Sequence, residues 1–263
     1  MNDFPYITDK KYPYLLTVAI PTRKRIEHLL ETLESIKDNT KDKSRIEIII
    51  RADNDDEETL ENLHRVEEYN KHFDMNFIID ERWGGYADMD KILNQCFNQS
   101  KGEFFLALND DCVVRSKDWD EILNKHSGKI CVVQTGYKEY NCKEEWNEID
   151  VYNPRLIPWD ASQGTHSTIH TMNLCHRIIP ETLGYFNCHE SGDRQFDYIT
   201  TFQPSLRLEI FDIELHHYML PGEHVKDGII THPDSILGLK KQIEKDSQRL
   251  VDELKKTYGN NLS

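Results

Sequence analysis

The sequence has no hydrophobic run long enough to cross a membrane. A spanning helix needs about 20 consecutive apolar residues, whereas the longest early run, residues 15–20, has only the length of a strand. The first 14 residues contain charges and prolines but no apolar stretch. We therefore expect neither a secretory signal nor an integral membrane segment.

Cysteine pairs and positive charge are also scarce. The six cysteines are scattered without a CxxC pair, which predicts reduced thiols in a cytoplasmic protein and not a disulfide framework. The 32 Lys and Arg residues stand against 47 Asp and Glu residues, a net charge of −15. Sequence-independent binding to nucleic acid needs dense Lys and Arg, so we expect no nucleic-acid partner. Docking on anionic lipid by charge alone is excluded for the same reason.

The first half of the chain instead shows a regular alternation of strand and helix signals. Continuous apolar runs predict buried strands at residues 15–20, 46–50, 77–79 and 104–108. Apolar residues at helical spacing predict helices over 26–36, 60–73 and 89–97. Four such repeats with short connections predict an α/β fold, a Rossmann-like, doubly wound and mainly parallel sheet with helices on both faces. The carboxyl ends of its strands meet at one edge, where such folds bind ligands.

Beyond residue 130 the pattern is looser. We expect strands at 130–133 and 206–219, and long loops with a short antiparallel ribbon over 137–170. Apolar residues at helical spacing from residue 236 predict a C-terminal amphipathic helix. Because no repeat or linker interrupts the chain, we predict a single domain over residues 1–263.

Two expected strands end in acidic clusters. One cluster spans residues 53–56, and the other is Asn109, Asp110 and Asp111. Adjacent carboxylates at the end of a buried strand repel one another, and a divalent cation shared with a diphosphate would offset that repulsion. The alternative is that these residues cap the following helix or turn. The capping alternative is weaker for the second cluster, because an apolar strand delivers it directly to the ligand-binding edge.

The order of these motifs resembles the family-2 inverting glycosyltransferases of the GT-A fold. The resemblance rests on Pro21-Thr22 before a helix, the strand ending at Asp53, the segment 84–94, and the strand entering Asn109-Asp110-Asp111, which is similar to the family's DxD-type motif. It covers about residues 15–220. It implies that the domain comprises a nucleotide-sugar-binding half (15–133), an acceptor-binding and catalytic half (134–235) and a C-terminal helix (236–263).

The resemblance also implies an activity. The protein would be a hexosyl-transferring glycosyltransferase that inverts configuration and requires Mn²⁺ or Mg²⁺. Its donor would be a UDP-, GDP- or dTDP-sugar, and its acceptor a hydroxyl group of a glycan or another molecule.

The family pattern assigns roles to residues of the first half. Pro21 and Thr22 would line the nucleotide pocket, and Arg23 would reach a phosphate. Asp53 would accept a hydrogen bond from the base or the ribose, with Asp55 nearby.

The same pattern assigns the metal. Asp111 would be its principal ligand, and Asp110 would face the ribose or the metal. Asn109 stands where the family usually has Asp, and its amide can still bind sugar hydroxyls. Where the family has an Arg-Asn pair, this chain has Met89-Asp90-Lys91, which leaves Lys91 as a candidate phosphate contact.

An inverting transfer needs a carboxylate that deprotonates the acceptor hydroxyl. The resemblance implies that this base follows the turn at residues 183–186. Asp193 is the first choice, because backbone N–H groups hold a carboxylate at the start of a helix. Asp197 and Glu190 are alternatives, and Asp193 as a simple helix cap stays open.

Two adjacent histidines, His216 and His217, end a late apolar run at residues 210–215. The family often places a metal-binding histidine after such a strand, so one of this pair is a candidate ligand, ahead of His224 and His232. The alternative is a surface histidine satisfied by hydrogen bonds.

Three aromatic residues, Trp83, Tyr86 and Trp159, fall in expected loops at the ligand-binding edge. Their rings could stack on the apolar face of a sugar. Plain packing is the equal alternative.

Two rival functions stay open. A sugar nucleotidyltransferase would show a glycine-rich, basic loop after the first strand, whereas residues 21–25 are basic without glycine. A non-catalytic nucleotide-sugar-binding module would keep the fold without turnover. Asn109 and the missing Arg-Asn pair keep this second rival open.

Overall fold

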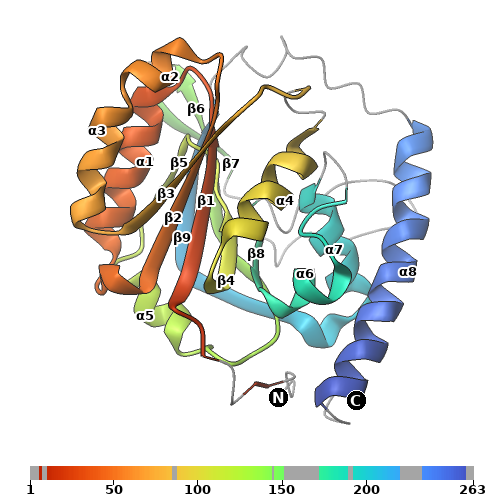
Figure 1. Ribbon diagram of the computed structural model, residues 1–263. Coiled ribbons are helices and arrows are strands. Elements are labelled where there is room, and N and C mark those ends of the chain that lie inside the picture. The colour runs from red at the N-terminus through yellow and green to blue at the C-terminus, as the bar shows by residue number, and fades with distance from the viewer. Residues whose placement is uncertain are drawn as a thin grey trace.

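The first half of the chain forms the predicted alternation of strands and helices (Figure 1). The computed structural model describes residues 6–7, 11–84, 88–143, 145–150, 172–188, 192–219 and 233–258. The strands are β1 (Tyr14–Thr22), β2 (Ile46–Asp53), β3 (Asp74–Asp80) and β4 (Gly102–Ala107). The helices are α1 (Ile26–Asn39), α2 (Glu57–Glu61), α3 (Leu63–Glu67) and α4 (Met89–Gln99). Strand β1 pairs in parallel with β2 and β4, and β2 with β3, which confirms the predicted parallel sheet.

The helix expected over 60–73 is broken into α2, α3 and a 3₁₀ helix, η2 (Glu68–Lys71). The side-chain amide of Asn62, between α2 and α3, donates to the carbonyl of Glu58 at 2.8 Å. Such a local side-chain bond competes with the helical backbone. The apolar spacing therefore marks the buried side of two short helices, and Phe73 precedes β3 instead of ending a helix.

The second half completes the sheet with β5 (Cys112–Val114), β6 (Val132–Lys143), β7 (Glu145–Asp150), β8 (Leu174–His176) and β9 (Arg207–Met219). The order of the nine-stranded sheet in the described residues is β3-β2-β1-β4-β8-β6-β9-β5, with β7 paired to β6. The β6–β7 pair is the predicted antiparallel ribbon, and β9 is the predicted late strand. The rest of the expected loop region, residues 151–171, lies outside the described part.

Helices cover both faces of the sheet (Figure 1). Helix α1 packs its apolar side, including Leu29 and Leu33, on one face. Helices α4, α6 (Ile178–Leu183), α7 (Gly192–Phe202) and α8 (Pro233–Tyr258) lie on the other, around Phe105 and Phe186. The described part of α8 confirms the predicted C-terminal amphipathic helix. With both faces covered, the ends of β1, β2 and β4 converge at one edge of the sheet.

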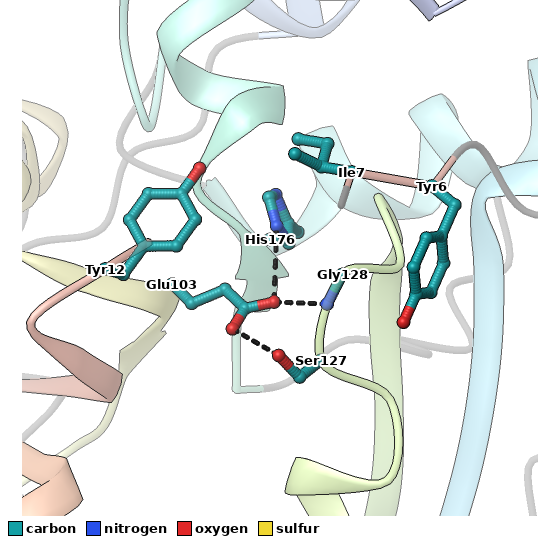
Figure 2. Close-up of a pocket in the computed structure, with 7 residues that line it drawn as sticks. All are labelled: Tyr6, Ile7, Tyr12, Glu103, Ser127, Gly128 and His176. Carbon is teal, nitrogen blue, oxygen red and sulfur yellow. Dashed lines mark hydrogen bonds and ion pairs between the residues drawn. The ribbon is translucent and has the colours of Figure 1, made fainter. Parts of the chain in front are cut away.

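A cavity of about 250 Å³ lies at the end of β4 that is opposite the acidic cluster (Figure 2). At its centre the buried carboxylate of Glu103, at the start of β4, accepts hydrogen bonds from Ser127 Oγ at 2.7 Å and from the backbone N–H of Gly128. His176 Nε2 lies 3.6 Å from the same carboxylate. Glu103 lies six positions before Asn109, about 20 Å along an extended chain. We interpret this carboxylate as a clamp that holds the loop after α5 (Trp119–Asn124).

Glu103→Gln should destabilise the protein at pH 7 by about 1.5–3 kcal/mol, the range for hydrogen bonds to charged groups. Burial alone would raise the pKa of Glu103. The hydrogen bonds from His176, Gly128 and Ser127 outweigh this effect, so that the pKa lies below its usual value. A lowered pKa contributes stability above the pKa of the unfolded chain, and this stability is lost as the pH falls through the folded value. Urea unfolding at pH 7 and below pH 4 measures the difference, which should shrink in acid. Glu121 is half-exposed, so the control variant Glu121→Gln should lower the free energy of unfolding by only about 0–1 kcal/mol. An equal loss of stability in both variants would contradict the clamp.

Candidate active site

The Asn109-Asp110-Asp111 cluster forms the turn between β4 and β5. Its backbone is anchored on three sides: Leu108 N–H donates to Ala19, Cys112 N–H to Asn109, and Tyr218 N–H to Asp111. Asp110 is completely buried and Asp111 is 2% exposed. Two adjacent carboxylates are thus held at the end of a buried strand, as the sequence predicts, and their charge must be offset inside the protein.

Arg25 supplies that positive charge in this structure. Its two terminal nitrogens each pair with one carboxylate, NH2 with Asp110 Oδ1 at 2.6 Å and NH1 with Asp111 Oδ2 at 2.9 Å. Thr22 Oγ1 donates to the second oxygen of Asp110 at 2.8 Å. Sequence reasoning expected a bound cation for this purpose and did not single out Arg25, whose only signal was its place in the basic run that follows β1.

The two carboxylates differ in acidity. Burial raises the pKa of Asp110 to about 7, against the lowering effect of Arg25 and with a further rise from the charge of Asp111. Burial also acts to raise the pKa of Asp111, but His217 and then Arg25 outweigh it, so that its pKa lies below the usual value. Asp111 therefore gives up its proton more readily than Asp110.

His217 faces the acidic turn, because β9 pairs with β5 so that Cys112 lies opposite His217. Its Nε2 atom is 3.1 Å from Asp111 Oδ1 and 3.3 Å from the amide nitrogen of Asn109. Its Nδ1 atom is 2.7 Å from the hydroxyl of Tyr137. His216 is adjacent in the strand and so points to the other face, where its Nε2 atom lies 3.2 Å from Glu214.

The donors of Asp111 and His217 suit a hard divalent cation. His217 Nε2 and Asp111 Oδ1 lie 3.1 Å apart, and an imidazole without its proton on Nε2 and a carboxylate can each ligate a metal through these atoms. Neighbouring ligands of an octahedral ion with bonds of 2.0–2.1 Å are separated by about 2.9 Å. In the described residues no group of three or more His, Cys, Asp or Glu side chains is placed to hold a metal, so further ligands would come from a substrate or water.

The 53–56 cluster divides into two parts. Arg23 pairs with Asp53 at 2.9 Å and with Asp55 at 2.5 Å. Asp56 instead accepts hydrogen bonds from the backbone N–H groups of Lys24 at 2.8 Å and Thr59 at 3.2 Å. The capping alternative therefore holds for Asp56, while Asp53 and Asp55 form an ion-pair group beside the first.

Arg51, which sequence reasoning missed, holds Asp53 from the other side. Its buried guanidinium pairs with Asp53 and donates to the carbonyl of Glu81 at 2.7 Å. The ring of Trp83 covers this guanidinium at 5.4 Å. Trp83 thus already packs on an arginine, and the two arginines fix the orientation of the Asp53 carboxylate.

The segment of the expected base begins at a well-anchored turn. The side chain of Asn94, in α4, accepts from the N–H groups of Phe186 and Asn187 and donates to the Asn187 carbonyl at 2.7 Å. Gln195 accepts from the N–H of Cys188 at 2.8 Å. Helix α8 adds a hydrogen bond between Tyr185 and the buried Asp246. Three helices thus hold this turn in place.

Helix α7 begins at Gly192, which puts Asp193 in its first turn, as the sequence predicts. Asp197 lies one turn later on the same side of the helix and is 6% exposed. The side chain of Asp193 lies outside the described part, as do Glu190, Tyr86, Trp159, His224 and His232.

Lys91, Pro21 and two cysteines complete the set of residues to place. Lys91 has a largely exposed side chain and pairs with Asp88 at 2.5 Å. Pro21 sits near the end of β1, half-buried and opposite Arg51. Cys112 and Cys188 are free thiols, and burial raises the pKa of Cys188 to about 11 and that of Cys112 well above its usual value. Neither thiol is thus poised as a nucleophile.

The arrangement of sheet, helices and acidic turn is that of a GT-A type fold, which solved structures share. S. aureus TarS 1–349 in complex with UDP-GlcNAc aligns with a TM-score of 0.61 and 16% identity over 88% of this chain and 66% of that chain. TarS 1–349 in complex with UDP aligns with a TM-score of 0.58 and 14% identity over 88% of this chain and 64% of that chain. This chain therefore spans less than two thirds of that relative's length. The mannosyltransferase PcManGT from Pyrobaculum calidifontis, in complex with GDP-Man and Mn²⁺, aligns with a TM-score of 0.57 and 11% sequence identity. This alignment covers 98% of this chain and 80% of that chain.

The family follows from the sequence match. The model described as glycosyl transferase family 2 matches residues 17–181, more than half of the chain. The chain belongs to glycosyl transferase family 2, which confirms the resemblance. No curated protein sequence matches it at a significant level. None of the helices in the described residues combines the length and the apolar character needed to span a bilayer.

Proposed function

We propose that this protein is a glycosyltransferase that moves a sugar from a nucleoside-diphosphate-sugar to an acceptor hydroxyl, with inversion and with Mn²⁺ or Mg²⁺ as cofactor. The observation that carries the proposal is the placing of His217 Nε2 3.1 Å from the buried carboxylate of Asp111 at the end of β4. Family membership supports it, as do the donors UDP-GlcNAc and GDP-Man in the similar structures.

The nucleotide would lie across the ends of β1 and β2. Pro21 and Thr22 would line its pocket. Asp53, oriented by Arg23 and Arg51, would accept a hydrogen bond from the base or ribose, with Asp55 beside it. A UDP-, GDP- or dTDP-sugar each offers such a donor group, so the base stays open.

Asp111 and His217 would hold the cation, while Asp110 keeps its bonds to Arg25 and Thr22. The bound cation would offset the charge that develops on the leaving diphosphate. Asp193 would take the proton of the acceptor hydroxyl as its oxygen bonds to the anomeric carbon from the face opposite the diphosphate. The bond from that carbon to the diphosphate breaks in the same step, so the configuration inverts.

A thermal-shift panel tests the donor class. UDP, GDP or dTDP at about 100 times its dissociation constant should stabilise the protein by about 2.7 kcal/mol, a rise in Tm of about 5–10 °C. The rise should be larger with Mn²⁺. The matching nucleosides without phosphate serve as the control, because the Mn²⁺-dependent part should vanish with them.

A turnover assay distinguishes an enzyme from a non-catalytic binding module. Release of UDP or GDP from UDP-GlcNAc or GDP-Man, with water as acceptor, should be slow but measurable and should require the metal. No thermal shift with any nucleoside diphosphate would contradict the proposed function. A shift without any release would favour the non-catalytic module.

We also propose a cytoplasmic location. The five cysteines whose state the structure describes are free thiols: Cys96, Cys112, Cys131, Cys175 and Cys188. Free cysteines suit a reducing compartment.

A further inference from the structure

We propose that Arg25 couples the binding of the cation to the binding of the donor, by occupying the carboxylate of Asp111 until a diphosphate arrives. The inference rests on the proposed function above and assigns a positioning role to a residue that the family resemblance did not single out. It makes Arg25 an internal counter-ion that is exchanged for the metal when the substrate binds.

The geometry of Arg25 permits such an exchange. Its NH2 nitrogen pairs with Asp110 at 2.6 Å and its NH1 nitrogen with Asp111 at 2.9 Å. Asp110 is fixed by a second bond, from Thr22, so it can hold the guanidinium while the contact to Asp111 breaks. The Arg25 side chain is 20% exposed, whereas those of the two aspartates are 0 and 1% exposed. The guanidinium is thus the member of this group that a ligand can reach from solvent.

Charge makes the guanidinium and the cation compete. Both need the carboxylate of Asp111, and two positive charges a few ångströms apart repel each other. The cation should therefore bind weakly while Arg25 occupies Oδ2 of Asp111. The other oxygen of this carboxylate, Oδ1, faces His217.

A diphosphate removes this competition. Arginine binds phosphate oxygens with parallel N–H bonds, so the NH1 group of Arg25 can pass from Asp111 to the donor. The carboxylate is then released to the cation, and the phosphates add negative charge beside it. Because linkage is reciprocal, the donor should raise the affinity for Mn²⁺ by the same factor as Mn²⁺ raises the affinity for the donor.

Titration of Mn²⁺, followed by the electron paramagnetic resonance signal of the free ion, tests the coupling. It is run on the wild type and on Arg25→Gln, each alone and with a saturating amount of the nucleoside diphosphate that shifts the wild-type Tm. We expect Arg25→Gln to bind Mn²⁺ alone about tenfold more tightly, within the usual range of coupling factors. The enhancement by nucleotide should fall by a similar factor. Unchanged Mn²⁺ affinity and unchanged enhancement in the variant would overturn the proposal.

Two further variants serve as controls. Arg45→Gln removes one positive charge from a surface ion-pair group with Asp42 and Glu121, just before the opposite end of β2. Its affinity for Mn²⁺ alone should stay within about twofold of wild type, because a distant surface charge is screened. Arg25→Lys keeps the charge but lacks the fork that spans both carboxylates. Its enhancement should lie between those of the wild type and Arg25→Gln, and it replaces Arg25→Gln if that variant does not fold.

The outcomes separate this inference from the proposed function. If the wild type binds Mn²⁺ and nucleotide cooperatively but Arg25→Gln and Arg25→Lys do so equally well, the role of Arg25 is wrong and the proposed function stands. If the wild type binds no nucleoside diphosphate, both are wrong.

Discussion

Asp111→Asn is expected to lower the rate of nucleoside-diphosphate release by about 10³-fold, since a metal ion supplies several kcal/mol of charge stabilisation in the transition state. Asn has the shape of Asp, so the side chain can remain in its buried place. It lacks the negative charge that a cation needs beside His217. The measurements are kcat with UDP-GlcNAc or GDP-Man and the affinity for Mn²⁺ in the presence of nucleotide, and both should fall together.

The matched control for this variant is Asp120→Asn. Asp120 is also fully buried, but it accepts hydrogen bonds from the backbone N–H groups of Lys41 and Asp42 at 2.9 and 3.0 Å. Its replacement should cost stability and leave the affinity for Mn²⁺ unchanged. If Asp111→Asn kept both Mn²⁺ binding and turnover, the assignment of Asp111 as a metal ligand would be wrong.

The parallel half of the sheet could be predicted because its strands are buried on both faces. Such strands are continuous apolar runs, as at residues 46–50 within β2, and the helices between them repeat their apolar residues at a regular spacing. Strands β5 and β8 have three residues each, and helices α5 and α6 have six. Elements of that length are too short to show a clear hydrophobic period, so no sequence pattern predicts them.

The same limit applies to the candidate metal-binding histidine. Alternation in a strand puts His216 and His217 on opposite faces, but the pattern of β9 does not tell which face meets the acidic turn. That choice depends on the pairing of β9 with β5, which sets Cys112 opposite His217. Register between strands so distant in sequence is a tertiary property.

Arg25 and Arg51 were missed for a related reason. Arg25 lies in a basic run that reads as solvent-exposed, and its partners Asp110 and Asp111 are far away in sequence. Arg51 interrupts an apolar strand, yet its side chain is buried because Asp53, the Glu81 carbonyl and Trp83 surround it. A buried guanidinium is tolerated only with such partners, and those partners are known only from the fold.

Asp193→Asn is expected to lower kcat by 10² to 10⁴-fold, the contribution of a general base, and to leave the affinity for nucleotide and Mn²⁺ unchanged. The reason is that Asp193 would act on the acceptor, from the first turn of α7, and not on the donor at the ends of β1 and β4. The measurements are the rate of donor hydrolysis at saturating donor and the Mn²⁺-dependent thermal shift.

Asp197→Asn and Glu190→Gln decide among the three candidate bases. Asp197 is buried one turn after Asp193 on the same side of α7, so Asp197→Asn should lower Tm more than it lowers kcat. Glu190→Gln should leave kcat unchanged if Asp193 is the base, because a single carboxylate takes the proton of the acceptor. If turnover survives in Asp193→Asn but is lost in one of the other two with nucleotide binding intact, that residue is the base. The turn held by Asn94 and Gln195 would then direct a different carboxylate toward the anomeric carbon.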